Sequence, residues 1–535
     1  MKRKHIIVLL LNVCIAFGYY LGNLSANETH LSSDLHNIIP VCLKKDDPSL
    51  FAKDLFCNDI KNVEYYTPFY IETLRFLAKF TDGNYVQALN ILTFICHILF
   101  GLLWYFLLFR ITKNFWIAFF VSIFMRGIIW IPGYEYWGIS DMWSMLPRVV
   151  YYAVLPLPFL LFNFKNNLKL YIASFLAGLL FNFHPITGLG GVLLFISYVL
   201  LQDYYEKKKF QKLFSLRNII VIALAFLGML PFFLTYFGNV STTADYDVSL
   251  YYKAIELKFS SFLREPTTFW KQWLHLKYIV YFIPVVLFTI YAYLRGNKTD
   301  KLRCNYLLIL SLTLFVLPNL FTYVELFVNE TFDKNIRMSF QLVRIQKLLI
   351  VSFFFAILFI LDILYRNQRF ARAFPFFFGA FALVLVISKH QIFDSIPMIS
   401  NDIIRRVLPN SLSIGNIANG NDDEDLNEIL TYIRENTPKE ALFFAPDIGR
   451  SGGRRSVDLD SKGANMLIEG NPKRFVQWYK DYTKFTALNR IEGNQFLRDY
   501  GVDYVLIYID LPEFELVLQK GTWRLYKVTE IKTIR

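Results

Sequence analysis

Long stretches without charged residues, separated by short basic loops, constrain the fold of this chain more than any other feature. Only 19% of its 535 residues are charged and 55% are hydrophobic, whereas a soluble domain has about 25% charged and about 45–50% apolar residues. The apolar stretches have roughly the ~17–25 residues that a membrane-spanning helix needs. We therefore expect an α-helical polytopic membrane protein with about eleven spans. They lie near residues 5–21, 86–109, 114–131, 148–164, 168–184, 185–202, 218–237, 276–294, 305–327, 347–365 and 374–388.

The loops between these stretches predict the orientation of the chain. If the N-terminus is cytoplasmic, the five short basic loops are cytoplasmic too, as the positive-inside rule requires. These loops are 110–113, 165–169, 207–217, 295–303 and 366–372. The loops 23–85, 132–147, 238–275 and 328–346, the turn at His184 and the C-terminal region then lie outside. Because the basic residues gather in loops, the net charge of +13 does not indicate a nucleic-acid partner.

Two apolar segments allow alternative interpretations. The run from His5 to Leu21 after Met1-Lys-Arg-Lys fits a signal peptide or an uncleaved anchor, and the lack of a small-x-small cleavage site favours the anchor. Residues 168–202 can form one tilted helix or two helices. We expect two that meet at His184-Pro185, because proline disfavours helix at the residue before it.

The chain divides into five parts by composition. We expect a first transmembrane helix (1–22), a long outer loop (23–85), a helix bundle (86–388), a linker (389–420) and an extracytoplasmic α/β domain (421–535). In the last part, periodicity predicts helices at 426–436 and 473–485 and strands at 441–445, 502–509 and 523–528. About 110 residues can bury a core of their own.

The five cysteines divide according to this topology. Cys14, Cys96 and Cys304 lie in or beside expected spans, where cysteine is usually an inert packing residue. Cys42 and Cys57 both lie in the first outer loop, where an oxidising compartment permits a disulfide. Two free thiols are the alternative.

The first outer loop concentrates ionisable residues in a chain that has few of them. Carboxylates and an imidazole are the groups that general acid–base chemistry and metal binding use. The residues are Asp34, His36, Asp46, Asp47, Asp54, Asp59 and Glu64. Asp34, His36 and Asp54 are the candidate catalytic residues, and the alternative is a set of solvated surface charges.

A second outer loop combines acids with aromatic rings. It contains Glu135, Trp137 and Asp141, with Arg148 just beyond it. Asp141 is a further candidate catalytic residue, and the other three are candidate substrate-binding residues. A sugar stacks its C–H faces on such rings while its hydroxyls need acceptors, so this loop is a candidate sugar site. An interfacial aromatic belt is the alternative.

Other ionisable residues lie at or within expected spans. His184 lies at the outer end of one span, as a candidate catalyst or a helix-end residue. Arg337, Arg344 and Lys347 are outer basic residues that break the positive-inside rule. Binding of a lipid phosphate and snorkelling of the side chains at a helix end explain them equally well. Arg126 lies inside an expected span and needs a partner or a cavity.

Three common motifs are absent from the sequence. There is no Walker A loop, no HExxH motif and no CxxC pair. ATP-driven transport and zinc proteolysis are therefore poorly supported.

Several local patterns carry a resemblance to a known family. They are His36-x-x-x-Pro40, Asp47-Pro-Ser-Leu-Phe-x-x-Asp54, His184-Pro185 and Leu430-Thr-Tyr-Ile-Arg-Glu-Asn-Thr-Pro438. These patterns are similar to those of uncharacterised bacterial multi-pass membrane proteins. The layout of first helix, acidic outer loop, helix bundle and C-terminal domain resembles the GT-C superfamily of integral-membrane glycosyltransferases.

The resemblance implies transfer of a sugar from a polyprenyl-phosphate donor to an acceptor at the outer face of the membrane. By position, Asp34 or Asp54 corresponds to the first-loop acid, and Glu135 or Asp141 to the second. Arg337 and Arg344 correspond to the phosphate site. A divalent cation, Mg²⁺ or Mn²⁺, is used only in some branches. The first loop lacks the adjacent Asp-Glu pair of one branch and the chain lacks the Trp-Trp-Asp-Tyr-Gly motif of another, so donor and acceptor stay open.

Two other functions remain alternatives. The chain can be a non-catalytic binding or assembly partner of lipid-linked glycans, or a transporter or flippase of such lipids. A transporter places charges along a path across the bilayer, whereas the polar residues here gather at one expected face. We therefore favour surface chemistry, with the protein in a bacterial inner membrane.

Overall fold

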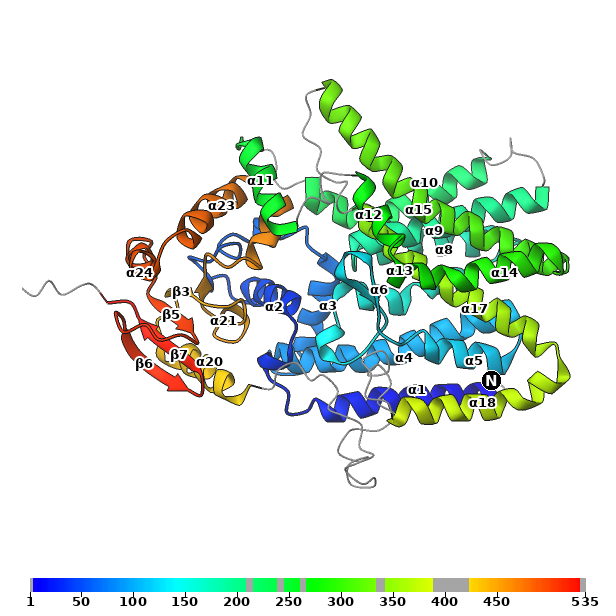
Figure 1. The fold of residues 1–535 in the computed structure, drawn as a ribbon, viewed down its shortest axis with the longest axis horizontal. Coiled ribbons are helices and arrows are strands. Elements are labelled where there is room, and N and C mark those ends of the chain that lie inside the picture. The colour runs from blue at the N-terminus through cyan, green and yellow to red at the C-terminus, as the bar shows by residue number, and fades with distance from the viewer. Residues whose placement is uncertain are drawn as a thin grey trace, which may run out of the picture. The chain divides into compact units, whose positions relative to one another are not determined.

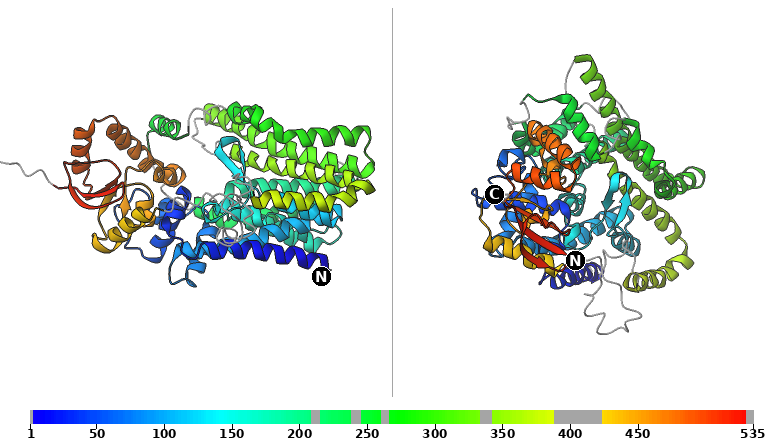
Figure 2. Two further views of the ribbon diagram at one scale, coloured as in Figure 1. Left: turned by 60° about the horizontal axis from the view of Figure 1, so that its bottom comes forward. Right: turned by 60° about the vertical axis from the view of Figure 1, so that its left-hand side comes forward.

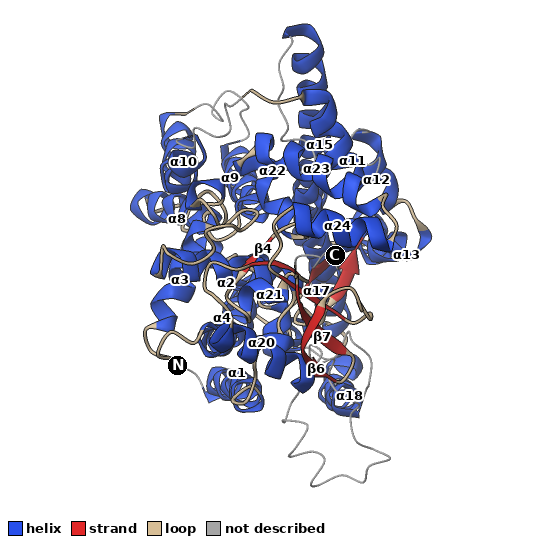
Figure 3. Cartoon of the chain, turned by 90° about the vertical axis from the view of Figure 1, so that its left-hand side faces the viewer, coloured by secondary structure: helices blue, strands red, loops and turns tan. Residues whose placement is uncertain are grey.

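The computed structural model describes residues 3–207, 215–237, 245–259, 266–332, 342–387 and 423–529. The chain is mostly helical, with few strands (Figure 3). It divides into two compact units. The first, here called the helical unit, comprises Met1–Leu24, Asn90–Pro231 and Ser261–Ala418, and the second, called the sheet unit, comprises Ser25–Leu89, Phe232–Ser260 and Asn419–Arg535.

In the described part of the chain, seven helices are long and apolar enough to cross a membrane. Each coincides with a predicted span. Five are single helices: α1 (Arg3–Gly22), α4 (Tyr85–Thr112), α9 (Pro185–Lys207), α10 (Leu216–Phe237) and α15 (Lys298–Phe332). Two are continuous runs of shorter elements. The first run joins α13 (Leu276–Ile279), η8 (Val280–Phe282) and α14 (Ile283–Leu294), and the second joins η9 (Val343–Leu349) and α17 (Ile350–Tyr365). Their length and composition indicate a membrane protein.

The other four predicted spans correspond to helices that are not among these seven. Three are short, namely α5 (Phe115–Phe124), α6 (Pro147–Val154) with α7 (Pro156–Leu161), and α8 (Asn167–Phe181). The fourth, α18 (Gln368–Ile387), carries Arg369 and Arg372 in its first turns.

The span predicted for residues 114–131 ends earlier than expected. Helix α5 stops at Phe124, and the chain turns into a short antiparallel hairpin of β1 (Ile129–Ile131) and β2 (Glu135–Trp137). Gly138 follows the hairpin at a φ of +116°, and a Cβ there would lie 2.4 Å from the carbonyl oxygen of Gly127. Only glycine fits this position. The hairpin places Glu135 where a continuous helix would not.

The pair of helices predicted at 168–202 is confirmed. Helix α8 ends at Phe181 and α9 begins at Pro185, and the two helices pack against each other. A Cβ at Gly188 would lie 2.5 Å from the Cα of Phe181, so the close approach requires glycine. In the same unit α9 packs on α15, and α14 packs on α15 and α17 (Figures 1 and 2).

The sheet unit is built around five strands in the order β4-β3-β5-β7-β6. They are β3 (Leu442–Phe444), β4 (Ser456–Val457), β5 (Tyr504–Ile507), β6 (Glu515–Lys520) and β7 (Trp523–Lys527). Strand β3 pairs in parallel with β4 and β5, and the pairs β5–β7 and β6–β7 are antiparallel.

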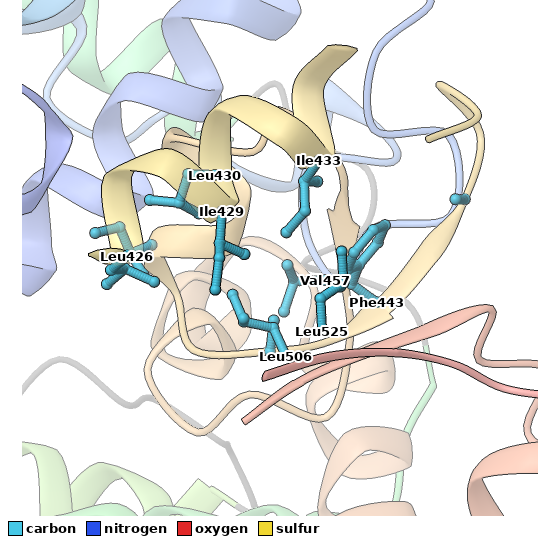
Figure 4. Close-up of a cluster of buried hydrophobic side chains, with 11 residues drawn as sticks. Leu426, Ile429, Leu430, Ile433, Phe443, Val457, Leu506 and Leu525 are labelled. Atoms are coloured by element: carbon cyan, nitrogen blue, oxygen red, sulfur yellow. The ribbon is translucent and has the colours of Figure 1, made fainter. Parts of the chain in front are cut away.

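Helix α20 (Glu424–Asn436) covers one face of this sheet. Its residues Leu426, Ile429, Leu430 and Ile433 follow the helical spacing of a single apolar face. They pack on Phe443, Val457, Leu506 and Leu525 (Figure 4). Asp423 caps the helix by accepting a hydrogen bond from the Leu426 backbone.

The second core of the sheet unit involves α24 (Arg490–Asp499) and the end of α23 (Pro472–Thr486). Three predicted strands and two predicted helices are present, whereas β4, β6 and α24 were not predicted. The predicted first outer loop contains two α-helices, α2 (Ser33–Asp46) and α3 (Pro68–Ala78), and belongs to the sheet unit from Ser25 on. Helix α11 (Val248–Phe259) belongs there too and packs against α23.

Candidate functional site

Four segments of the helical unit bring five ionisable side chains together. Glu135 comes from β2, Arg148 from α6, His184 from the turn before α9, and Arg344 and Lys347 from η9. The Nε of Arg344 lies 2.9 Å from Oε1 of Glu135, and its second guanidinium nitrogen contacts the same oxygen. The other carboxylate oxygen lies 3.1 Å from Arg148 and 3.7 Å from Lys347 Nζ. We call these five residues the Glu135 cluster.

Local structure explains why these side chains converge. Glu135 opens β2, opposite Ile131 in the hairpin. Pro147 starts α6, so Arg148 lies in its first turn, with its guanidinium 4.7 Å from the centre of the Tyr136 ring. The segment η9 is a 3₁₀ helix, in which residues three apart project from the same side. Arg344 and Lys347 therefore share a face.

His184 completes the cluster. Its Nδ1 accepts a hydrogen bond at 3.2 Å from the backbone N–H of Thr187, so the ring caps the start of α9. It also interacts electrostatically with Glu135 and with the three basic side chains of the cluster.

Within the cluster, three basic side chains contact one carboxylate. Burial alone would raise the pKa of Glu135, but Arg344, Lys347 and Arg148 outweigh burial and hold this pKa well below its usual range. Glu135 is therefore ionised at neutral pH, and its geometry suits holding cations rather than accepting a proton.

The side chains differ in exposure and in hydrogen bonding. Those of Glu135 and Lys347 are 3% and 1% exposed, whereas that of Arg344 is 29% exposed. The Nζ of Lys347 has no partner within hydrogen-bond distance in the described part of the chain. A buried ammonium group in this state costs stability unless an acceptor reaches it. The cluster can therefore bind an anion that approaches beside Arg344.

The other residues predicted for the helical unit are placed differently. Trp137 is fully buried, donates its Nε1–H to the carbonyl oxygen of Met125 and packs on Tyr152, so it supports the hairpin. Asp141 accepts hydrogen bonds at 2.6 Å from Asn23 and from the Met142 backbone. Arg337 lies outside the described residues.

Asp34, His36 and Asp54 all belong to the sheet unit. Asp54 is 1% exposed and lies 2.6 Å from the Nε of Arg450. His36 contacts the Ser451 hydroxyl at 2.7 Å, and burial lowers its pKa to about 4. Asp34 pairs with Lys462 at 2.5 Å. Asp54 and His36 thus make structural contacts in a folded core, and Asp34 is partly exposed.

The structure shows the alternative of free thiols for the cysteines of the first loop. Cys42 and Cys57 are both buried and unbridged, and burial raises the pKa of each thiol. Among the residues that the structure describes, no group of three His, Cys, Asp or Glu side chains is arranged to hold a metal ion.

Sequence reasoning missed the surroundings of Arg126. This residue follows α5 rather than lying inside a span, and its guanidinium is fully buried. It contacts the neutral side chains of Asn12 and His97, and His97 in turn contacts the carbonyl oxygen of Ser140 and stacks on Tyr19. In the sequence, only the presence of polar residues such as Asn12 and His97 within apolar stretches could have indicated these contacts.

Fold and site together define an integral membrane protein with a buried, cation-rich cluster. Comparison of the sequence with known protein families and with curated proteins finds no match. The function is therefore argued from the site.

Proposed function

We propose that this chain is a GT-C-type glycosyltransferase that moves a sugar from a polyprenyl-phosphate donor to an acceptor, and that the Glu135 cluster holds the donor phosphate. The observation that carries the proposal is the buried carboxylate of Glu135 with three cations in contact, one of which, Lys347, has an ammonium group with no hydrogen-bond partner in the described part of the chain. A phosphate offers several acceptor oxygens and negative charge to Arg344 and Lys347. Glu135 orients both cations from the opposite side.

The position of the cluster along the chain supports a lipid ligand. His184 immediately precedes the candidate span that begins at Pro185, and Arg344 and Lys347 lie in the first residues of the span that begins at Val343. Span ends lie at the level of lipid head groups, where basic side chains meet lipid phosphates. A polyprenyl chain can then lie along the apolar helices while its phosphate reaches the cluster.

The reaction chemistry supports the same assignment. When the bond between the sugar and the phosphate oxygen breaks, a phosphodiester becomes a phosphomonoester and gains negative charge. Cations fixed near that oxygen bind the product-like charge more strongly than the substrate charge, which lowers the barrier. Arg344 suits this role because its planar guanidinium can donate two hydrogen bonds to one phosphate.

A base that activates the acceptor completes the proposal. Both carboxylate oxygens of Asp54 are used inside the sheet unit, by Arg450 and by the backbone N–H groups of Phe56 and Cys57. Asp34 and Asp141 are therefore the acids to test as the general base.

Binding of farnesyl phosphate to the full chain in nanodiscs tests the phosphate site, with farnesol as the uncharged control. We expect Arg344→Gln and Lys347→Gln each to weaken binding of farnesyl phosphate at least tenfold and to leave farnesol unchanged. Arg369→Gln, at an exposed arginine outside the cluster, is the matched control. Equal binding of farnesyl phosphate by all variants would refute the site.

Catalysis is tested separately by incubating the protein with polyprenyl-phosphate sugars and measuring released polyprenyl phosphate. Loss of release in Asp34→Asn or Asp141→Asn, with farnesyl phosphate still bound, supports transfer. Tight binding without release from any donor would instead favour a non-catalytic partner of lipid-linked glycans.

A further inference from the structure

The sheet unit contains a cavity of about 930 Å³ that shares no residue with the Glu135 cluster. Its walls come from three places in the sequence: residues 26–50, residues 82–86 and residues 427–455. The volume is in the range of small-molecule sites, about 300–1,000 Å³. The cavity is therefore large enough for a ligand of several rings.

Most acids in the wall are already paired. Glu28 lies 3.7 Å from Arg434, and Asp47 lies 2.7 Å from Lys439. Asp46 pairs with Arg75 at 2.8 Å and also accepts a hydrogen bond from the Tyr85 hydroxyl. These acids hold the wall together rather than attracting a cation.

Two arginines of the wall have no carboxylate partner among the described residues. Arg455 donates to the carbonyl oxygens of Arg434 and Thr437. Arg454 has a buried Nε with no hydrogen-bond partner in the described part of the chain. Burial and the neighbouring Arg434 lower the pKa of Arg454, and Glu28 offsets only part of this effect. An anionic group inside the cavity would give the Nε of Arg454 a hydrogen-bond acceptor and a counterion.

The backbone of Arg454 adds a second observation. Its φ is +53°, a left-handed conformation that non-glycine residues rarely adopt. Such strain costs about 1 kcal/mol or more and persists where a side chain is needed in place. Two glycines, Gly452 and Gly453, precede it, so glycine would have been the relaxed choice at this position too.

The rest of the wall includes two further acids, Asp82 and Glu435, several apolar side chains and a set of neutral polar residues. It presents amides and hydroxyls on several sides, together with the ring of Tyr85. The neutral residues are Asn27, Asn84, Asn427, Thr431, Thr437 and Ser451. Dispersed donors and acceptors suit a ligand with many hydroxyl groups better than a small inorganic anion.

We propose that this cavity binds an acidic saccharide, with Arg454 contacting its anionic group. The proposal does not depend on glycosyl transfer, since it uses only the sheet unit. The carboxylate of the sugar pairs with the guanidinium, and its hydroxyls exchange hydrogen bonds with the amides and hydroxyls of the wall.

Calorimetric titration of the full chain in nanodiscs tests the proposal with three probes: trigalacturonate, neutral maltotriose and monomeric galacturonate. We expect trigalacturonate to bind at least tenfold more tightly than either of the others. Arg454→Gln should remove this preference, whereas Arg490→Gln, at an exposed arginine away from the cavity, should keep it. Maltotriose binding as tightly as trigalacturonate would overturn the anionic contact, and galacturonate doing so would overturn the saccharide assignment.

The variant Arg454→Gly controls for the possibility that Arg454→Gln loses binding because it does not fold. Glycine relaxes the left-handed backbone, so this variant should unfold at the same temperature as the parent or at a higher one. We expect it nevertheless to lose the preference for trigalacturonate. Retained preference in Arg454→Gly would refute the role of the guanidinium.

Discussion

The two units each contain a buried charge centre, and the centres have opposite compositions. In the helical unit, three cations surround the carboxylate of Glu135. In the sheet unit, two carboxylates flank the guanidinium of Arg450, with Asp54 at 2.6 Å and Asp460 at 2.7 Å. The two centres differ in how completely their hydrogen bonds are satisfied.

The Arg450 centre is complete. Its guanidinium also donates to the carbonyl oxygen of Val457 at 2.9 Å and to Asn37 at 3.4 Å. Burial would lower the pKa of Arg450, but Asp460 and Asp54 outweigh burial and raise this pKa. In the Glu135 cluster, in contrast, three cations share one carboxylate, and the ammonium of Lys347 has no hydrogen bond among the described residues. A saturated centre holds a fold together, whereas an unsaturated one has capacity for a ligand.

The largest effect is expected when the saturated centre is broken. Asp54→Ala leaves Arg450 buried with one carboxylate and also removes acceptors from the backbone N–H groups of Phe56, Cys57 and Val457. Breaking a buried pair costs about 3–5 kcal/mol. We expect hydrogen exchange in β3 and β4 to lose most of its protection.

The control for this change is Asp499→Ala, at an exposed carboxylate of α24. It should leave the exchange of β3 and β4 unchanged. If Asp54→Ala behaves like this control, Asp54 is not a structural residue and its catalytic assignment regains support.

A smaller loss of stability is expected when a low pH protonates His36, beside the saturated centre. His36 lies next to Asn37 and contacts Ser451, and burial and Lys462 lower its pKa to about 4 against the ordinary 6.5. The unfolded chain therefore binds a proton between pH 6.5 and pH 4 that the folded chain does not. The His36 contribution to stability is full above pH 6.5 and falls by about 3 kcal/mol as the pH drops to 4.

Comparison with His36→Gln isolates this contribution. Asp447 and Asp458, whose pKa burial raises to about 6, change stability in the opposite direction, because their folded forms bind protons more readily. The difference in unfolding free energy between the parent and His36→Gln should therefore change between pH 6.5 and pH 4 and stay constant above pH 7. A difference that does not vary with pH would show that His36 titrates normally.

Removing the carboxylate from the unsaturated centre should have an effect that a ligand can reverse. Glu135→Gln leaves Arg148, Arg344 and Lys347 without their shared counterion, and we expect a loss of about 2 kcal/mol in the helical unit. Because the proposed ligand supplies negative charge, farnesyl phosphate should raise the unfolding temperature of this variant more than that of the parent. The same ligand should not rescue Asp54→Ala. Rescue of both variants, or of neither, would remove the distinction between the two centres.

The sequence predicted the elements of the fold better than the contacts between them. The positions of the seven candidate spans follow from long apolar stretches, and the break between α8 and α9 follows from the proline after His184. Both features depend only on residues that are close in the sequence. Arg344 and Lys347 stood out because outer loops are normally poor in basic residues. That both contact Glu135 depends on a hairpin more than 200 positions earlier, which local patterns do not encode.

Asp54 also shows that local sequence does not predict distant contacts. Its acidic loop indicated catalysis, but its partner Arg450 lies 396 positions further along the chain. No local pattern distinguishes a carboxylate that will be buried against a distant arginine from one that will face a substrate. The helix predicted through Arg126 failed for a related reason: α5 already ends at Phe124, and the hairpin that follows brings Gly138 against Gly127.

The smallest effect is expected at an exposed charge group, which separates the role of burial from the role of charge number. Glu72 pairs with Lys45 and Arg75, each at 2.8 Å, so one acid contacts more than one cation here, as at Glu135. Its side chain is 50% exposed, so water already solvates the charges. Glu72→Gln should change the unfolding free energy by less than about 1 kcal/mol, and added salt should reduce the change further. A loss as large as that of Glu135→Gln would mean that charge number rather than burial sets the cost, and the unsaturated cluster would then no longer be a special site.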